Sequence, residues 1–328
     1  MFDFVHVFVL SFSFSGTIDT LTLLRMIESF AMIVFIGGYF FLRWIIDERT
    51  PLLLREPFTK KKEMKMYFVV FLLFCLTGFL QLYVRAEFLT NGSMINDELW
   101  SMMGLLAFTT IIGMVAWIRP LIIGMFILTV SRFSNRSLSF TMMSLFLLTF
   151  PLSSHAFVYG MVFTQFFHLL GTAVWVGGLV GLVLYSFFLG ESIQKLHYLH
   201  DLLTYFSVIA LIMFVIISFT GLIMSFSYVG SWEGLTSSSY GDILLWKILL
   251  SFIIVIIAAF HRFIWFPKLK KAVRFSDKKK SIKQLIWTVR LELIVITIVV
   301  VLAGVLSATS PPSSPQGPDL LPNQHNHR

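Results

Sequence analysis

The stretch Gln165-Phe-Phe-His168-Leu-Leu-Gly-Thr-Ala-Val-Trp175-Val-Gly177-Gly178-Leu decides how this chain folds, because it is strongly apolar and carries one histidine. Trp175 follows His168 by seven residues, close to two helical turns, so both side chains share one helical face. The glycine pair that follows lets a neighbouring membrane helix approach closely. A ring nitrogen in an apolar span is costly without a partner, so His168 either links helices by a hydrogen bond or serves a functional site.

Composition identifies the class of protein. Hydrophobic residues make up 57% of the 328 residues, and the mean hydropathy is +0.85. Charged residues make up 13%, against about 25% in a typical soluble domain, which excludes a soluble protein. The single cysteine, Cys75, lies in an apolar run, so the sequence predicts neither a disulfide framework nor a thiolate metal cluster. The net charge of +8 does not indicate nucleic-acid binding, because most basic residues gather on one side of the expected spans.

Runs of roughly 20 apolar residues predict membrane-spanning helices. We expect an all-α polytopic membrane protein with eight transmembrane helices. The initial segment, 1–20, lacks a basic region and a cleavage pattern, so it predicts an external interfacial segment rather than a signal peptide. The tail, 307–328, is rich in Pro, Ser and Gln and predicts a disordered external segment. The expected spans cover residues 21–44, 67–88, 100–130, 138–152, 161–189, 203–228, 242–265 and 286–306.

Basic residues distinguish the two sides of the expected bundle. Nineteen of the 25 Lys and Arg residues lie in or beside the loops that follow the first, third, fifth and seventh spans. The alternate loops, 86–99, 153–160 and 230–241, contain none. Because basic loops stay in the cytoplasm, this pattern predicts a protein of the cytoplasmic membrane with both termini on the extracytoplasmic side.

The two halves of the chain resemble each other, which predicts two parallel four-helix repeats, residues 21–152 and 153–306. Chance similarity among apolar helices is the alternative. In this register Glu28 falls where His168 falls. Arg119 and Lys247 also correspond; such residues offset carboxylates, draw anions or, more often, snorkel. The other matched positions are Ile36-Gly37-Gly38 with Val176-Gly177-Gly178, and Thr77-Gly78 with Thr220-Gly221.

Soft and borderline metal donors gather toward the expected outer side. His155 lies at the outer end of the fourth span, and His168 lies about two turns into the fifth. Imidazole and thioether ligands together suit copper, and the lack of a cysteine cluster argues against a structural zinc site. The candidate ligands are His155, His168, Glu28, His6 and Met161.

Each candidate also has a structural interpretation. Glu28 lies three residues from Arg25 on one helical face, so these two side chains could form an ion pair. His155 could be solvated at the membrane interface, and most of the 15 methionines must serve packing. The combination of two histidines beside one short external turn, with a carboxylate at the related position, favours a metal site.

The segment from His155 through His168 to Gly178 resembles the CopD/PcoD copper-resistance membrane proteins, as do Thr220-Gly221 and segments 240–247 and 306–311. The chain is also similar to the membrane part of related Gram-positive copper-uptake proteins, although no external stretch is long enough for their CopC-like β-sandwich. The resemblance implies eight helices, copper handling at the extracytoplasmic face and inward movement of copper. It makes His155 and His168 the first candidates for ligands, whereas the N-terminal segment with His6 has no family counterpart.

These observations favour a copper permease that is neither an enzyme nor an ATPase, since the sequence has no Gly-x-x-x-x-Gly-Lys-Ser/Thr loop for phosphate. Copper ions and the lipid bilayer would be its partners, together with a CopC-like extracytoplasmic copper carrier. Two alternatives stay open. A b-type haem redox protein would use His155 and His168 as axial ligands. A receptor or scaffold protein would bind the metal without moving it.

Overall fold

The computed structural model describes residues 20–46, 59–90, 97–133, 135–188, 193–260, 263–264 and 275–312. Within these ranges the chain folds into helices, and no strand occurs. The expected N-terminal segment with His6, and nearly all of the expected C-terminal tail, lie outside the described residues.

Most of the helices are long and apolar. Among the described residues, seven helices have the length and composition needed to cross a membrane, as expected for a multi-pass membrane protein. The expected fourth span, α7, is a shorter apolar helix of 17 residues. In chain order the elements are α2 (Thr20–Phe40) with the π-helical η1 (Phe41–Ile46), α4 (Lys60–Leu89), α5 (Asp97–Thr109), α6 (Ile111–Leu128) with the π-helical η4 (Thr129–Phe133), α7 (Arg136–Leu152), α8 (His155–Val158), α9 (Val162–Phe188), α10 (Ile193–Val229), α11 (Trp232–Thr236), α12 (Ser239–Phe260) and α14 (Phe275–Ala308).

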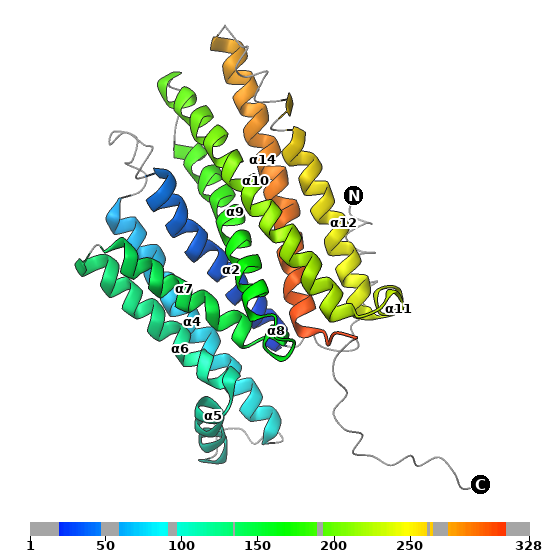
Figure 1. The fold of residues 1–328 in the computed structure, drawn as a ribbon. Helices are drawn as coiled ribbons and strands as arrows, with labels where there is room; N and C mark the ends of the chain where they lie inside the picture. The colour runs from blue at the N-terminus through cyan, green and yellow to red at the C-terminus, as the bar shows by residue number, and fades with distance from the viewer. Residues whose placement is uncertain are drawn as a thin grey trace.

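The third apolar run, expected as one span, is two helices, α5 and α6. The chain leaves the helical conformation at Thr110, whose backbone is extended and whose Oγ1 accepts a hydrogen bond from the Gly113 N–H at 2.9 Å. A threonine in this role caps the start of a helix. A Cβ at position 113 would lie within van der Waals overlap of the Leu106 carbonyl oxygen, so only glycine fits this tight turn. Helix α5 therefore packs beside the ends of α4 and α6 (Figure 1).

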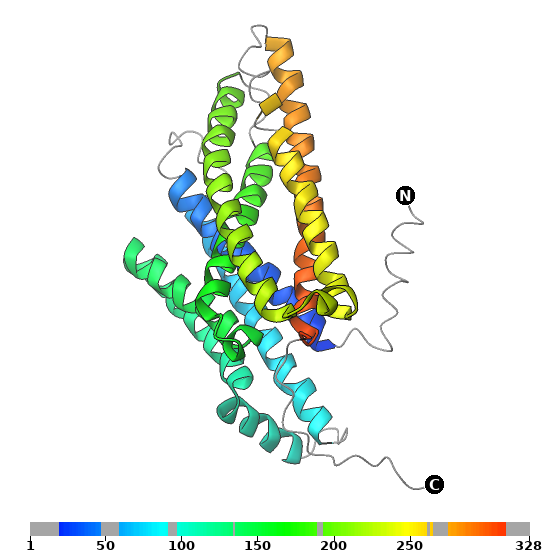
Figure 2. The same ribbon diagram turned by 45° about the vertical axis from the view of Figure 1, so that its right-hand side comes forward.

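Helices α2 and α9 lie at the centre of the molecule (Figure 1). About 61% of the apolar window of α2 and η1 is buried, and 56% of that of α9, compared with 11% for α10 and 17% for α12. Helices α4, α6 and α7 lie on one side of the central pair, and α10, α12 and α14 lie on the other (Figures 1 and 2). The outer faces of α10 and α12 are apolar, as contact with lipid requires.

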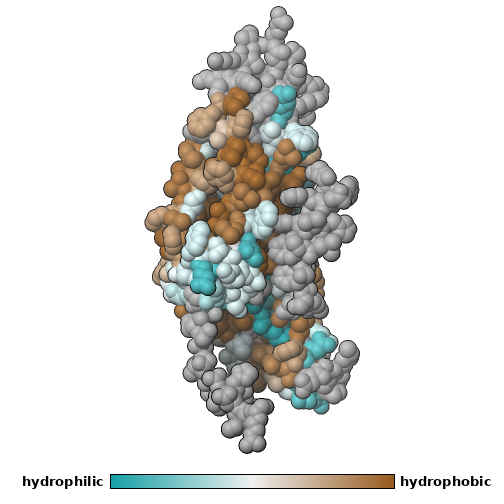
Figure 3. Space-filling model, turned by 90° about the vertical axis from the view of Figure 1, so that its right-hand side faces the viewer, coloured by the Kyte–Doolittle hydropathy of each residue, from teal (hydrophilic) through white to brown (hydrophobic). Residues whose placement is uncertain are grey.

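Much of the exposed surface is apolar. Figure 3 shows broad hydrophobic areas over the described residues on the face that lies to the right in Figure 1. Polar residues gather in smaller areas on that face. A soluble protein rarely exposes an apolar area of this extent, so the surface agrees with the membrane class that composition indicated.

The two central helices touch through glycine. A Cβ on Gly37 of α2 would lie 2.5 Å from the Cα of Gly177 in α9, and a Cβ on Gly177 would lie 2.4 Å from the Cα of Gly37. Small residues at such a crossing bring the two backbones into contact. The glycine pairs singled out in the sequence therefore mark the contact between the two halves of the molecule.

An aromatic cluster holds α2 against its other neighbours. Phe35 makes edge-to-face contacts with Tyr67 of α4, Phe126 of α6 and Phe146 of α7, with ring centroids 4.9 to 5.6 Å apart. All four side chains are fully buried. This geometry is the one that aromatic quadrupoles prefer, and it fixes the position of α2 in the region where Glu28 lies.

Candidate functional site

A carboxylate and a guanidinium form an ion pair inside the helix bundle. Glu28 of α2 is 3% exposed, and its Oε2 accepts a hydrogen bond from Arg119 Nη1 of α6 at 2.6 Å. Its other oxygen, Oε1, accepts from the Thr77 hydroxyl of α4 at 2.9 Å. Both carboxylate oxygens of Glu28 are thus engaged by neighbouring helices.

The guanidinium of Arg119 is held on several sides. Its Nε donates to Thr149 Oγ1 at 3.0 Å, and its Nη2 donates to Ser153 Oγ at 2.9 Å. The ring of Phe150 lies 4.1 Å from its Cζ, a cation–π contact. Charge and hydrogen bonds are therefore satisfied within this group, as a buried ion pair requires.

Arg25 has a different partner from the one expected. Its Nη1 donates to the backbone carbonyl of Ser307, near the end of α14, at 3.2 Å. The ion pair considered for Glu28 and Arg25 is thus made by Glu28 and Arg119. Arg25 instead joins the start of α2 to the end of α14.

His168 of α9 is the residue that the sequence register matched with Glu28. Its Nδ1 lies 3.1 Å from the Ile217 carbonyl oxygen and 3.1 Å from Thr220 Oγ1, both on α10. The Thr220 hydroxyl donates to the Ile216 carbonyl at 2.6 Å, so its oxygen is free to accept. Since a carbonyl only accepts, we assign the proton to Nδ1, which leaves the Nε2 lone pair available to a metal. Metal-binding histidines commonly have this arrangement.

Glycine brings the imidazole close to α10. A Cβ on Gly221 would lie 3.3 Å from His168 Cε1, so a larger residue would push the ring away. Thr220 and Gly221 thus act together: one hydroxyl orients the ring, and the missing side chain makes room for it.

Lys247 of α12 is the charged group that interacts electrostatically with His168. His168, Thr220 and Lys247 lie about 9 to 14 Å along their helices from the nearer ends, at the rise of 1.5 Å per residue. The threonine contact is the part that the two groups share: Thr220 Oγ1 lies 3.1 Å from His168 Nδ1, and Thr77 Oγ1 lies 2.9 Å from Glu28 Oε1.

His155 lies at the start of α8, between α7 and α9. Its ring lies near the Ser307 backbone, whose carbonyl accepts from Arg25 at 3.2 Å. Burial, and secondarily the Arg25 charge, lower the pKa of His155 below its ordinary value of 6.5. The neutral ring that a metal needs is therefore favoured at this position.

The other candidates lie apart. Met161 Sδ accepts weakly from Thr164 and Ser227, each at 3.9 Å. His155 and His168 have separate partners, and His6 lies outside the described residues. Across the ranges that the structure describes, no group of three or more His, Cys, Asp or Glu side chains could hold a metal together. A copper site would therefore combine an imidazole with thioether, hydroxyl or carbonyl donors.

A second polar group, which sequence reasoning missed, lies toward the other end of the bundle. Glu63 of α4 is 7% exposed and accepts from Arg43 Nη2 at 2.6 Å and from the Tyr67 hydroxyl at 2.7 Å. The spacing of Glu63 and Tyr67, one helical turn, is the signal that could have predicted their contact. This end of the bundle thus contains an ion pair whose carboxylate is buried.

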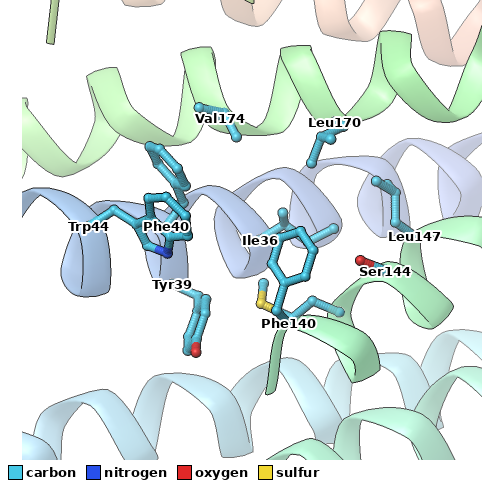
Figure 4. A pocket seen from close by; sticks show the side chains of 10 residues that line it. Ile36, Tyr39, Phe40, Trp44, Phe140, Ser144, Leu147, Leu170 and Val174 are labelled. Carbon is cyan, nitrogen blue, oxygen red and sulfur yellow. The ribbon is translucent and has the colours of Figure 1, made fainter. Parts of the chain in front are cut away.

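An apolar groove lies between α2, α7 and α9 (Figure 4). Its walls are aliphatic and aromatic except for the Ser144 hydroxyl and the polar tips of Tyr39 and Trp44. It contains none of the candidate metal ligands. The residues that line it are Ile36, Tyr39, Phe40, Trp44, Phe140, Met143, Ser144, Leu147, Leu170 and Val174.

Over the described residues, the fold and site define an all-helical, multi-pass membrane protein with a half-buried histidine and a buried arginine within its helices. A family model described as Copper resistance protein D matches residues 200–306. The resemblance to the CopD family is thus confirmed over this region, which contains Thr220, Gly221 and Lys247. No curated protein and no solved structure matches the chain.

Proposed function

We propose that this protein binds copper ions and moves them inward across the cytoplasmic membrane, with capture at the extracytoplasmic face. The observation that carries the proposal is the environment of His168. Its Nδ1 is fixed by α10 within the region that resembles the copper-resistance family, and Nε2 remains as a ligand. In this proposal His168 is the central ligand, His155 receives copper at the entrance, and Met161, Glu28 and His6 are auxiliary candidates.

The proposal includes eight spans in two parallel four-helix repeats, with α7 as the fourth span. Three local similarities support the repeats. Gly37 and Gly177, which correspond in sequence, contact each other. The Gly113 N–H donates to Thr110 Oγ1 at 2.9 Å, and the Gly241 N–H donates to Ser238 Oγ at 3.0 Å, so α6 and α12 begin in the same way. The Glu28 and His168 groups also share a threonine contact.

The orientation belongs to the same proposal. The basic loops would face the cytoplasm, and both termini, α8 and α11 would face the extracytoplasmic side. A CopC-like copper carrier would then deliver copper to the end of the bundle where His155 lies.

Reconstituted protein tests this function. Proteoliposomes with the parent protein should accumulate copper faster than empty liposomes, and His168→Ala should remove most of that uptake. Copper binding without uptake would instead support a receptor or scaffold, and a redox-sensitive Soret band in the purified protein would support the haem alternative. Either result would refute transport as the function.

A further inference from the structure

Helices α9 and α10 meet along a seam with a regular antiparallel register. At one end of the seam, the Met161 sulfur accepts a hydrogen bond from the Ser227 hydroxyl at 3.9 Å. Seven residues further along α9, His168 Nδ1 lies 3.1 Å from Thr220 Oγ1, which lies seven residues back along α10. The two contacts therefore mark one continuous seam between helices that lie side by side (Figures 1 and 2).

The register predicts which residues face each other between and beyond these contacts. It continues three residues past the histidine, where a Cβ on Gly171 would lie 2.9 Å from Ile217 Cγ1. Three residues after Met161, the same register places Thr164 of α9 opposite Met224 of α10. The Thr164 hydroxyl donates to the Met161 sulfur at 3.9 Å, so this threonine also lies at the seam.

Met224 lies on the face of α10 that carries the contacts with α9. It is four residues from Thr220 and three from Ser227, spacings that place the three side chains on one helical face. It is half-buried and packs against the buried cluster that contains Tyr228 and Tyr240. The two methionines of the seam thus lie at neighbouring levels, one on each side of it.

These methionines lie at the end of the bundle where α8 and α11 are found (Figure 1). Met161 directly precedes α9, and Ser227 lies two residues before the end of α10. His168 lies seven residues deeper, or about 10 Å along the helix, and Met224 lies at a level between Met161 and His168. The seam therefore presents two thioethers and then an imidazole, in order from the mouth inward.

Thioether sulfur suits one kind of ion. It is a soft, neutral donor that selects Cu(I) among the copper states. The hydroxyl contacts of the Met161 sulfur are weak, because a thioether is a weak acceptor, so a soft cation can replace them at little cost. A site of two such donors would release its ion readily, as conduction through successive sites requires.

We propose that Met161 and Met224 form a thioether site for Cu(I) at the mouth of the α9–α10 seam, and that this site passes the ion to His168. The thioether site rests on the register of the two helices, whereas the passage to His168 rests on the proposed function. The paired methionines would then make Cu(I), rather than Cu(II), the form that enters.

Methyl NMR with Ag(I), which has the charge and softness of Cu(I), tests the thioether site. In protein labelled at its methionine methyl groups, in chloride-free buffer and a Cys75→Ser background, the Met161 and Met224 signals should shift together and saturate. Met161→Leu and Met224→Leu assign the signals and keep the packing volume. Each should weaken Ag(I) binding about tenfold or more, the loss that outer-shell partners of a metal already cause. Met125→Leu, which removes an exposed methionine of α6, should leave binding unchanged.

Three results would overturn the thioether site. The first is the lack of a saturable shift in the parent protein. The second is an equal shift with Zn(II), whose ligands in proteins are Cys, His and carboxylate groups. The third is loss of both shifts in a folded His168→Ala variant, because the shifts would then arise from metal held by the imidazole.

Uptake of Cu(I) into proteoliposomes tests the passage to His168. At low Cu(I) concentration, Met161→Leu and Met224→Leu should take up copper about tenfold more slowly than the parent and Met125→Leu, in proportion to the lost affinity. If the parent takes up no copper while the Ag(I) shifts saturate, the proposed function fails and the thioether site stands. If both leucine variants take up Cu(I) at the parent rate, the passage through this site is refuted.

Discussion

Arg119 and Lys247 carry the same charge at comparable positions of α6 and α12, but within the described residues only Arg119 pairs with a carboxylate. Arg119→Met should lower the free energy of unfolding by about 3–5 kcal/mol, because it leaves the Glu28 carboxylate buried without its cation. Lys247→Met should leave the free energy of unfolding unchanged or raise it, because it removes one charge and leaves no other charge without a partner. Unfolding in mixed detergent micelles measures both. Equal losses in the two variants would show that Lys247 has a structural partner.

The lowered pKa of His155 predicts how stability depends on pH. Burial and the Arg25 charge lower its pKa, so the folded state favours the neutral ring. The stability that this preference contributes is complete above the ordinary value of 6.5 and is lost as the pH falls toward the lowered pKa. Histidine NMR titration, assigned with His155→Asn, should show a midpoint below 6.5, and Arg25→Ala should raise that midpoint. An unchanged midpoint in Arg25→Ala would exclude the influence of Arg25.

At single residues the sequence indicated which polar side chains lie within the helices, but not which partners they contact. His168 stood out because an imidazole in an apolar run is rare, and Thr220 stood out because the repeat register matched it with Thr77. Helical spacing suggested an ion pair between Glu28 and Arg25. In the structure Glu28 instead pairs with Arg119, 91 residues away in sequence. Local spacing cannot predict which helices pack together, and packing decides which charges meet.

The crossing of α2 and α9 is the element-scale feature that depends most on one residue type. Gly177→Ala should lower the free energy of unfolding by about 1–3 kcal/mol, the usual effect of overpacking, because the added Cβ would overlap the Gly37 backbone. Gly104→Ala in α5 is the matched control: it has open space for a Cβ, and helix propensity predicts a slight gain. Thermal unfolding in detergent compares the two. Equal melting temperatures for Gly177→Ala and Gly104→Ala would mean that α2 and α9 do not pack through glycine.

Most elements could be predicted from apolar runs, because a bilayer requires long stretches without charge. The break in the third run could not, since Thr109 and Thr110 are two small polar residues within apolar sequence, and the capping role of Thr110 depends on the backbone around it. The length of α10 and α14 was also underestimated, because both helices extend beyond their apolar parts.

For the whole molecule, the distribution of Lys and Arg predicts the orientation in the membrane. In a Cys75→Ser background, a membrane-impermeant maleimide applied to intact cells should label Ser237→Cys, between α11 and α12. It should label Lys61→Cys, at the start of α4, only after permeabilisation. Both positions are exposed, so access to the reagent depends on the side of the membrane. The reverse pattern would invert the proposed direction of transport.

The central claim is that the half-buried imidazole of His168 holds copper. Metal analysis and copper-edge X-ray absorption on the purified parent protein and His168→Ala test it most directly. The account predicts nitrogen ligands of imidazole type around copper in the parent, and loss of most of that copper from a folded His168→Ala variant. Equal copper content and an unchanged coordination spectrum in the variant would contradict it.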